Sequence, residues 1–379
     1  MRAARMRLAA GMLVVLLMRP AAVPAGTAVC AEGSHPDGQD AGRAAVLRTA
    51  DQELAAGPFS VMDKPRVPPS GDKHDFLSLA PYWWPDPSTP DGMPYIRRDG
   101  EVNPESKRGT DEVPFGRMTD AVSWLALAYR ETKDERFAAR AAWLLRVWFL
   151  DAATRMKPNL DYGQGVPGRS TGRAEGIIAT RRLVAIVEAA RSLEASPSWT
   201  VADREGFRAW CAAYAEWLKT SLNGRAEAEA ENNHGTWYDA QLTALLLYTG
   251  AQDEARARAE AAKRRIASQI EPDGRQPREL ARTRSWSYSV MNLDGWFTLA
   301  ALADEAGVDL WHYRTSDGRS LRGALEYLVP FARGAAPWPH RQITPIDNAG
   351  LVRLLERAAL VWRDDRYRAL AGTLRRSSR

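Results

Sequence analysis

Cysteine and histidine are scarce in this sequence. Of the 379 residues, only 2 are Cys and 5 are His, and Cys30 lies next to an apolar N-terminal segment, so the mature chain retains no pair for a disulfide. The sequence also lacks a His pair at helical spacing with a glutamate, a Cys-x-x-Cys motif and a glycine-rich phosphate loop. We therefore expect no metal ion and no nucleotide cofactor.

Long apolar runs are missing everywhere except at the N-terminus. There, three arginines precede the apolar run from Leu8 to Met18, and small residues follow it. This pattern is typical of a secretory signal peptide, and the run is shorter than the roughly 20 residues that a membrane span needs. Cys30 has no leucine three residues before it, which favours release over lipid anchoring. We expect residues 1–31 to be a signal peptide and the mature protein to be a monomer in the periplasm or outside the cell, with no membrane partner.

The net charge indicates nothing about a polyanionic partner. The formal charge is +5 at pH 7, but four arginines precede the first acid, Glu32, so the mature chain has +5 − 4 = +1. The basic character of the sequence is thus mostly that of the signal peptide. We expect no nucleic-acid partner.

From about residue 115 onward, apolar residues recur at helical spacing between short polar or Gly/Pro breaks. The predicted helices form five pairs: 115–129 with 134–150, 176–193 with 201–222, 234–249 with 252–270, 289–306 with 321–331, and 348–362 with 365–374. Residues 234–249 are apolar almost all round, whereas 252–270 have one apolar stripe, which distinguishes an inner helix from an outer one. We predict an all-α fold, an incomplete (α/α) toroid of about five to six hairpins, with residues 32–379 as a single domain; a flat solenoid would give the same pattern.

Residues 57–112 differ from the rest because they are rich in Pro, Gly and Asp and cannot form regular helices. Disordered segments are poor in aromatic residues, yet this one contains Phe76, Tyr82, Trp83, Trp84 and Tyr95. We predict an ordered, aromatic-rich lid or wall over one end of the helical domain.

The first polar cluster with catalytic potential is the sequence AEAENNHGTWYDA. His234 stands where a polar stretch meets an inner helix, and Asn233 offers an amide to a carboxylate near the free N–H groups of the helix start. The alternative is that one asparagine is only an N-cap and His234 a structural polar residue. Trp237, one turn later, fits the core or a sugar-binding subsite.

The second cluster, PRELARTRSWSYSVMNL, places Arg282 and Arg284 ahead of Tyr288 at another helix start. A tyrosine becomes an acid or base when a nearby cation lowers its pKa. The alternative is a solvated basic turn followed by a core tyrosine.

The third cluster lies in the predicted lid, in the sequence DKHDFLSLAPYWWPDP. Tyr82, Trp83 and Trp84 offer flat apolar faces to a pyranose ring, and Lys73 and His74 offer positive charge to its carboxylate. Packing of the lid on the helices explains the same aromatic residues equally well.

Together, these clusters contain the groups that β-elimination on a uronic-acid polymer requires. Asn233 and Arg282 suit neutralisation of the carboxylate, which acidifies the C5 proton as oxyanion-hole donors stabilise developing charge. His234 and Tyr288 suit the proton transfers. A non-catalytic carbohydrate-binding protein is one alternative. A glycoside hydrolase is another, and its two opposed carboxylates would come from Asp86, Asp161, Glu175, Asp239 and Asp294.

Four stretches resemble the alginate lyase domain family: KHDFLSLAPYWWPDPSTPDGMPYIRRDGEVNPES, GRAEGIIATRRLV, NNHGTWYDAQLTALLLYTG and ELARTRSWSYSVMNL. The resemblance covers residues 70–330 and implies a toroid that degrades a uronate polysaccharide without a metal. It implies that Asn233, His234, Arg282 and Tyr288 are catalytic, with Arg284 as the alternative arginine. We also assign Arg181, in the second stretch, to substrate binding. Poly-mannuronate is the expected substrate, and mixed alginate and glucuronan are alternatives.

Overall fold

The computed structural model describes residues 36–377, so the predicted signal peptide lies outside the described residues. The described chain is mostly helical, which confirms the predicted all-α class. Each predicted pair of helices is present: α2 (Glu112–Thr132) with α3 (Glu135–Leu145), α4 (Leu183–Ser192) with α5 (Val201–Thr220), α7 (Asn233–Thr249) with α8 (Gln252–Gln269), α10 (Ser285–Glu305) with α11 (Leu321–Ala332), and α12 (Ala349–Val361) with α13 (Asp365–Ser377).

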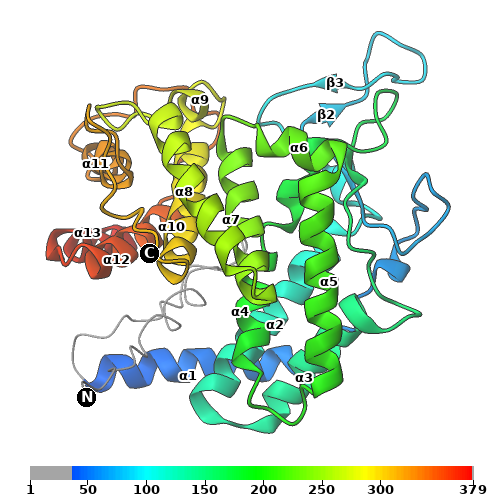
Figure 1. Cartoon of the computed structure of the whole chain (residues 1–379). Coiled ribbons are helices and arrows are strands. Elements are labelled where there is room, and N and C mark those ends of the chain that lie inside the picture. The colour runs from blue at the N-terminus through cyan, green and yellow to red at the C-terminus, as the bar shows by residue number, and fades with distance from the viewer. Residues whose placement is uncertain (1–35, 378–379) are drawn as a thin grey trace.

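The first helix of each pair belongs to an inner layer. Helix α2 packs on α4, α4 on α7, α7 on α10, and α10 on α12, so the inner helices follow one another around an open ring (Figure 1). Helices α3, α8, α11 and α13 pack on the inner helix that precedes them, and α5 packs on α7. This arrangement agrees with the predicted incomplete toroid.

Burial along the third hairpin explains why its two helices take different layers. In α7, 15 residues are buried, including polar ones, because neighbouring helices surround it. In α8, burial is confined mainly to one stripe that includes Ala255, Ala259, Ala262 and Ile266. A helix that is apolar all round is buried, and a helix with one apolar stripe faces solvent on its other side.

One of the longer helices of the described chain was not predicted from the sequence. Helix α1 (Pro36–Glu53) precedes the first predicted pair and packs on α2 (Figure 1). Its buried side chains include Ala45, Val46 and Ala50, and only one of these is larger than alanine. The apolar stripe of α1 is therefore too weak to stand out in the sequence.

The predicted lid region, residues 57–112, contains short strands that form two small sheets. Strand β1 (Leu77–Leu79) pairs in parallel with β4 (Tyr162–Gly165), and β2 (Trp83–Trp84) pairs antiparallel with β3 (Ile96–Arg97). Figure 1 shows β2 and β3 at the same end of the molecule as α6 (Leu222–Ala228) and α9 (Pro277–Leu280). These two short helices precede the inner helices α7 and α10 in the chain, so the starts of both inner helices lie at the lid end.

A buried ion pair fastens the base of the lid region to the helical body. Lys64 Nζ lies 3.0 Å from Asp111 Oδ2, and both side chains are fully buried. The Asp111 carboxylate also accepts the backbone N–H of Leu77 at 2.7 Å, at the start of β1. Because Asp111 is the residue before α2, these contacts join the lid directly to the first inner helix.

Candidate active site

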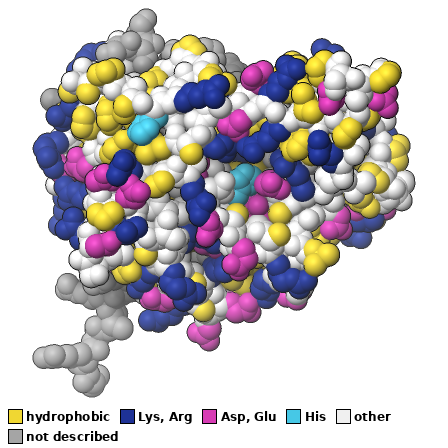
Figure 2. All heavy atoms as spheres, turned by 90° about the horizontal axis from the view of Figure 1, so that it is seen from above, with side chains coloured by type: hydrophobic (Ala, Val, Ile, Leu, Met, Phe, Trp, Pro, Cys, Tyr) yellow, Lys and Arg dark blue, Asp and Glu magenta, His cyan; other side chains and the backbone are white. Residues whose placement is uncertain are grey.

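A groove of about 1420 Å³ lies between the lid region and the starts of α7 and α10. Basic and acidic side chains surround the hollow on this face (Figure 2). Of the predicted site residues, the ones that line the groove are Tyr82, Trp83, Arg181, Asn233, His234, Arg282 and Tyr288. The structure thus brings together all four predicted catalytic residues, although they come from clusters about fifty residues apart in the sequence.

The start of α7 presents Asn233 and His234 to the groove. Asn232 is the N-cap, and its side-chain oxygen accepts the backbone N–H of His234 at 3.2 Å. A capping residue satisfies one of the helix's free N–H groups, so Asn232 carries out the structural role that the sequence left open. Asn233 and His234 are therefore free for another role.

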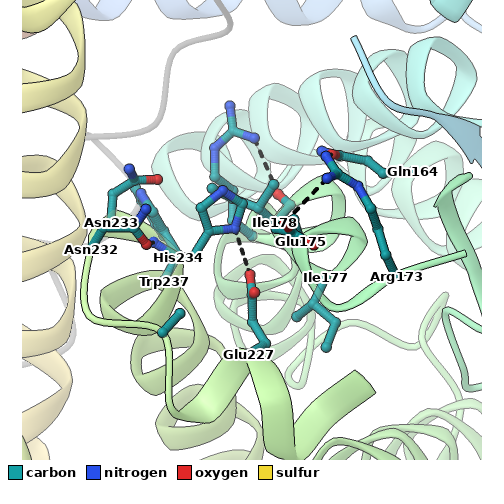
Figure 3. A network of polar contacts seen from close by, with 12 residues as sticks. Gln164, Arg173, Glu175, Ile177, Ile178, Glu227, Asn232, Asn233, His234 and Trp237 are labelled. Carbon is teal, nitrogen blue, oxygen red and sulfur yellow. Dashed lines mark hydrogen bonds and ion pairs between the residues drawn. The ribbon is translucent and has the colours of Figure 1, made fainter. Parts of the chain in front are cut away.

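The imidazole of His234 is held by a buried carboxylate. Its Nδ1 lies 2.7 Å from Oε1 of Glu227, on α6, and the exposed fraction of Glu227 is 1% (Figure 3). Burial raises the pKa of Glu227, and the charge of His234 opposes that rise. When Nδ1 carries the proton and donates a hydrogen bond to Glu227, Nε2 is left as an acceptor. Glu227 thus favours the tautomer in which His234 can take up a proton.

Asn233 is held by a second buried carboxylate, Glu279 of α9. Its backbone N–H donates to Glu279 Oε1 at 2.7 Å, and its side-chain Nδ2 lies 3.0 and 2.9 Å from the two carboxylate oxygens. Burial raises the pKa of Glu279, and the N–H groups of Asn233 oppose that rise. The adjacent Asn233 and His234 are therefore oriented separately, one by each glutamate.

Sequence reasoning missed both glutamates. Glu227 belongs to the alternating run AEAEAE, which resembles a solvated acidic stretch, and Glu279 belongs to a short turn before Arg282. Both have an exposed fraction of 1% in the structure. A buried carboxylate needs a partner, but the partners lie 7 and 46 residues away. The spacing in the sequence therefore gave no usable signal.

Tyr288 lines the same groove from the first turns of α10. Its hydroxyl forms a 2.5 Å hydrogen bond with the hydroxyl of Tyr82 in the lid. The guanidinium carbon of Arg282 lies 3.8 Å from the centre of the Tyr288 ring. Burial nevertheless raises the pKa of Tyr288 well above its usual range, because it outweighs the opposite effect of Arg282. The neighbouring cation therefore acts in the expected direction, but burial prevails, and the resting phenol holds its proton.

Arg282 is bound to the lid. Its Nε and Nη2 donate to Asp99 Oδ1 at 3.0 and 2.7 Å, and Asp99 also accepts the backbone N–H of Thr283 at 3.1 Å. Hydrogen bonds from Arg282 and Thr283 hold the pKa of Asp99 well below its usual range, despite the opposing effect of burial. Asp99 is 183 residues from Arg282 in the sequence, so this pair was not predictable.

Arginine side chains lie over the rings of both lid tryptophans. Trp83 lines the groove, and the guanidinium carbons of Arg169 and Arg173 lie 5.2 and 5.9 Å from its ring centre. Trp84 does not line the groove; Arg98 lies 5.4 Å from its ring centre, and its indole N–H donates to Glu101 O at 2.9 Å. Both rings thus make cation–π contacts. Of the two, it is Trp83 that lies in the groove, where the predicted binding of a pyranose would take place.

Four other predicted substrate contacts do not line the groove. Lys73 and His74 lie at the base of the lid, where Lys73 Nζ donates to Met62 O at 3.3 Å and His74 Nδ1 lies 2.6 Å from Arg155 O. Trp237 is 3% exposed and belongs to the core, where it packs against Gly295 of α10. Arg284 is the residue before α10 and pairs in a β-bridge with Gln342. Of the two alternative arginines, it is Arg282 that faces the groove.

The carboxylates proposed for a glycoside hydrolase are not assembled as a pair. Of those five residues, Glu175 alone lines the groove, and it pairs with Arg173 at 3.1 Å. Asp239, on α7, forms ion pairs with Arg258 and Arg265 of α8, each at 2.8 Å. Hydrolysis by opposed carboxylates is therefore less well supported than elimination.

Neither a metal-binding cluster nor a membrane-spanning helix is present among the described residues. Residues 36–377 contain no group of three or more His, Cys, Asp or Glu side chains placed to hold a metal ion. Within the same residues, every helix is too short or too polar to cross a membrane.

Comparison with known proteins identifies the family. The family model described as alginate lyase matches residues 60–338. The crystal structure of an alginate lyase from Bacteroides ovatus is 41% identical over 88% of this chain and 89% of that chain, with a TM-score of 0.84. No curated protein matches the chain.

More distant structures share the fold. Alginate lyase A1-III from Sphingomonas species A1 is 17% identical over 88% of this chain and 93% of that chain, with a TM-score of 0.55. A variant of alginate lyase A1-III in complex with a tetrasaccharide is 16% identical over 86% and 88%, with a TM-score of 0.57. Because the family model spans most of the chain and a relative at 41% identity has the same architecture, the protein belongs to the alginate lyase family and is a polysaccharide lyase.

Proposed function

We propose that the protein cleaves alginate, preferentially its poly-mannuronate blocks, by β-elimination that leaves a 4,5-unsaturated uronate at the new chain end. The observation that carries this proposal is the meeting of Asn233, His234, Arg282 and Tyr288 in one groove. A groove of about 1420 Å³ has room for several sugar rings, as sites that bind small ligands are smaller, at roughly 300–1,000 Å³.

The reaction breaks the C5–H bond and the bond from C4 to the glycosidic oxygen, and forms a C4–C5 double bond. The C5 proton is removed more easily when positive or hydrogen-bonding groups neutralise the adjacent carboxylate, an effect worth several kcal/mol. Asn233 lies in the groove beside the basic side chains Arg181 and Arg282. The lining of the groove is thus rich in positive charge, as this neutralisation requires.

We assign removal of the C5 proton to His234. Its side chain is 16% exposed, and Glu227 occupies Nδ1, so Nε2 is the nitrogen available to the substrate. As the imidazole gains the proton, the Glu227 carboxylate lies in place to stabilise the imidazolium. A positioned base of this kind contributes about 10²–10⁴ to the rate.

We assign protonation of the leaving oxygen to Tyr288. Burial raises the pKa of Tyr288, so the phenol is protonated at neutral pH and can act as an acid. Tyr82, whose hydroxyl lies 2.5 Å away, keeps the phenol oriented and is placed to share its proton. The two assignments divide base and acid between α7 and α10. Because mannuronate has its C5 proton and its C4 oxygen on the same face of the ring, both side chains would have to act from that face.

Glucuronan is the second candidate substrate, since its residues present the same carboxylate beside the same kind of C5 proton. Its cleavage would use the same residues. Glucuronate has the same configuration at C5 as mannuronate, whereas guluronate is the C5 epimer. It is therefore the comparison of poly-mannuronate with poly-guluronate that reports whether base and acid approach the ring from one face or from two.

The test is the ultraviolet absorbance of the purified protein with poly-mannuronate, poly-guluronate and glucuronan, each in the presence of a chelator. Rising absorbance from the C4–C5 double bond is expected. His234→Ala and Tyr288→Phe should abolish it, whereas His312→Ala and Tyr313→Phe, which change residues outside the groove, should not. New reducing ends without absorbance, or full turnover in both groove variants, would refute the proposal.

We also propose that residues 1–31 direct export, so that the enzyme meets its polymer outside the cytoplasm. A secretory signal has a basic start, a short apolar run and small residues at the cleavage site, and this segment has all three. N-terminal sequencing of the protein recovered from the periplasm or the medium tests this. A start at Met1 would refute it.

A further inference from the structure

The basic side chains that line the groove differ in one respect, namely whether a carboxylate of the protein already binds them. Among the described residues, Arg97 and Arg282 pair with Asp99 at 2.9 and 2.7 Å. Three more pairs in the groove are Arg173 with Glu175, Lys107 with Glu112, and Arg278 with Glu231. Arg181 is the one basic side chain of this lining for which residues 36–377 provide no carboxylate within 4.0 Å.

Arg282 is poorly placed to neutralise a substrate, because its positive charge is already matched. Two of its nitrogens donate to Asp99, and the face of its guanidinium lies on the ring of Tyr288. To bind a substrate carboxylate with the same nitrogens, Arg282 would have to leave Asp99. A bidentate arginine–carboxylate pair is among the stronger polar contacts in proteins. Arg282 is thus suited to fastening the lid and orienting Tyr288.

Arg181 lies at the end of the 3-10 helix Ala174–Thr180, and its position is costly for an unpaired cation. It is half-buried, and the one hydrogen bond of its side chain within the described residues runs from Nη1 to the backbone oxygen of Ile178, at 3.2 Å. Burial lowers the pKa of Arg181, but a guanidinium stays charged in proteins. A desolvated charge without a partner is unfavourable, so this position favours an anionic ligand.

The surroundings of Arg181 place it near the reacting groups. Arg181 and Tyr82 line the same groove, and the hydroxyl of Tyr82 binds that of Tyr288. The carboxylates of Glu112 and Asp294 oppose the effect of burial on the pKa of Arg181, but neither comes within ion-pair distance of it. The nitrogens of Arg181 not used by Ile178 therefore remain available to a ligand in the groove.

From these observations we infer that Arg181 binds and neutralises the carboxylate of the uronate residue whose C5 proton is removed, and that Arg282 is a positioning residue for the lid and Tyr288. This inference rests on the proposed lyase activity. It assigns a catalytic contact to Arg181, where the sequence indicated substrate binding in general. It also moves the main neutralising charge from the turn before α10 to the turn before α4.

The experiment compares wild type, Arg181→Gln and the control Arg191→Gln on poly-mannuronate. Arg191 lies at the end of α4 and binds Glu305 at 2.8 Å, so its replacement removes the same charge outside the groove. Loss of one preorganised donor to a developing charge costs about 10²–10³ in turnover. We expect a loss of this size in kcat/KM for Arg181→Gln, and activity close to wild type for the control.

A second substrate separates charge neutralisation from a structural role. In the methyl ester of poly-mannuronate the carboxylate is already neutral, so Arg181→Gln should lose far less activity on the ester than on the free acid. An equal loss on both polymers would overturn the inference. So would kcat/KM for Arg181→Gln within about threefold of wild type on the free acid, because a neutralising charge is worth far more than that.

Two further results keep the test decisive. If Arg181→Gln does not fold, Arg181→Lys retains the charge but loses the planar pair of donors, and it should show a partial loss on the acid and little loss on the ester. If wild type itself yields no absorbance on any uronate polymer, the proposed function fails. Activity in wild type with full activity in both Arg181 variants refutes this inference alone.

Discussion

Replacing Glu227 by glutamine tests how His234 is prepared for proton transfer. Glu227 is 1% exposed, and its carboxylate lies 2.7 Å from His234 Nδ1. Glutamine has nearly the same shape and can still accept the Nδ1–H, so Glu227→Gln removes the negative charge and little else. The carboxylate matters most when His234 becomes an imidazolium, since a charged pair then replaces a neutral one.

The size of the effect follows from the geometry. A hydrogen bond to a charged group contributes about 1.5–3 kcal/mol, and each 1.36 kcal/mol corresponds to roughly tenfold in rate. Glu227→Gln should therefore lower kcat by about 10- to 100-fold and leave KM nearly unchanged, because the effect arises in the transition state. Glu227→Ala should lose more, since Nδ1 then lacks any partner.

The assay is the initial rate of absorbance on the preferred uronate polymer, with kcat and KM determined separately. Glu216→Gln serves as the control because Glu216 lies on α5, with 61% of its side chain exposed. An unchanged kcat for Glu227→Gln would refute the role of Glu227. A rise in KM with normal kcat would show that Glu227 acts in binding rather than in proton transfer.

Three further predictions concern stability and positioning. Burial raises the pKa of Glu188 from 4.5 to about 7, so the folded state binds the proton more tightly than the unfolded state, and wild type should lose stability as pH rises from 4.5 to 7. In urea denaturation, the free energy of unfolding of Glu188→Gln should exceed that of wild type by up to about 3 kcal/mol at pH 8 and match it below pH 4.5. Asp99→Asn should lower the free energy of unfolding by about 1–2 kcal/mol, after allowance for the partial exposure of the Asp99–Arg282 pair. It should also speed proteolysis of the lid, and equal digestion rates for wild type and Asp99→Asn would contradict the anchoring role. Glu279→Ala should lower kcat more than Glu279→Gln, which keeps one acceptor for Asn233; equal losses would show that orientation of the amide is unimportant.

The inner and outer helices were predictable because their patterns are set by burial along a single segment. Residues 234–249 are apolar on every side and 252–270 on one, and the structure buries them accordingly. The start of α7 was equally clear, since a polar stretch ended where the apolar one began. Helix α1 was missed because its contact with α2 depends on small side chains.

The residues that hold the catalytic groups were less accessible to prediction. Asp99 and Arg282 are 183 residues apart, and Asn233 and Glu279 are 46 apart. Such pairs form only once the chain has folded, and acidic residues look alike in a sequence whether they are buried or solvated. The same limit applies to Tyr288, whose neighbouring cation suggested a lowered pKa before its burial was known.

The assembly of the groove from two kinds of structure determines how this enzyme can be altered. His234 and Tyr288 project from inner helices that the core surrounds, whereas Tyr82, Trp83 and Asp99 come from the strand-and-loop segment above them. Loops tolerate insertion and replacement far better than packed helices. Exchange of residues 81–103 between relatives, with Tyr82 and Asp99 retained, should therefore alter which polymer is accepted and preserve the proposed elimination chemistry. This makes the segment the natural site for engineering new specificity.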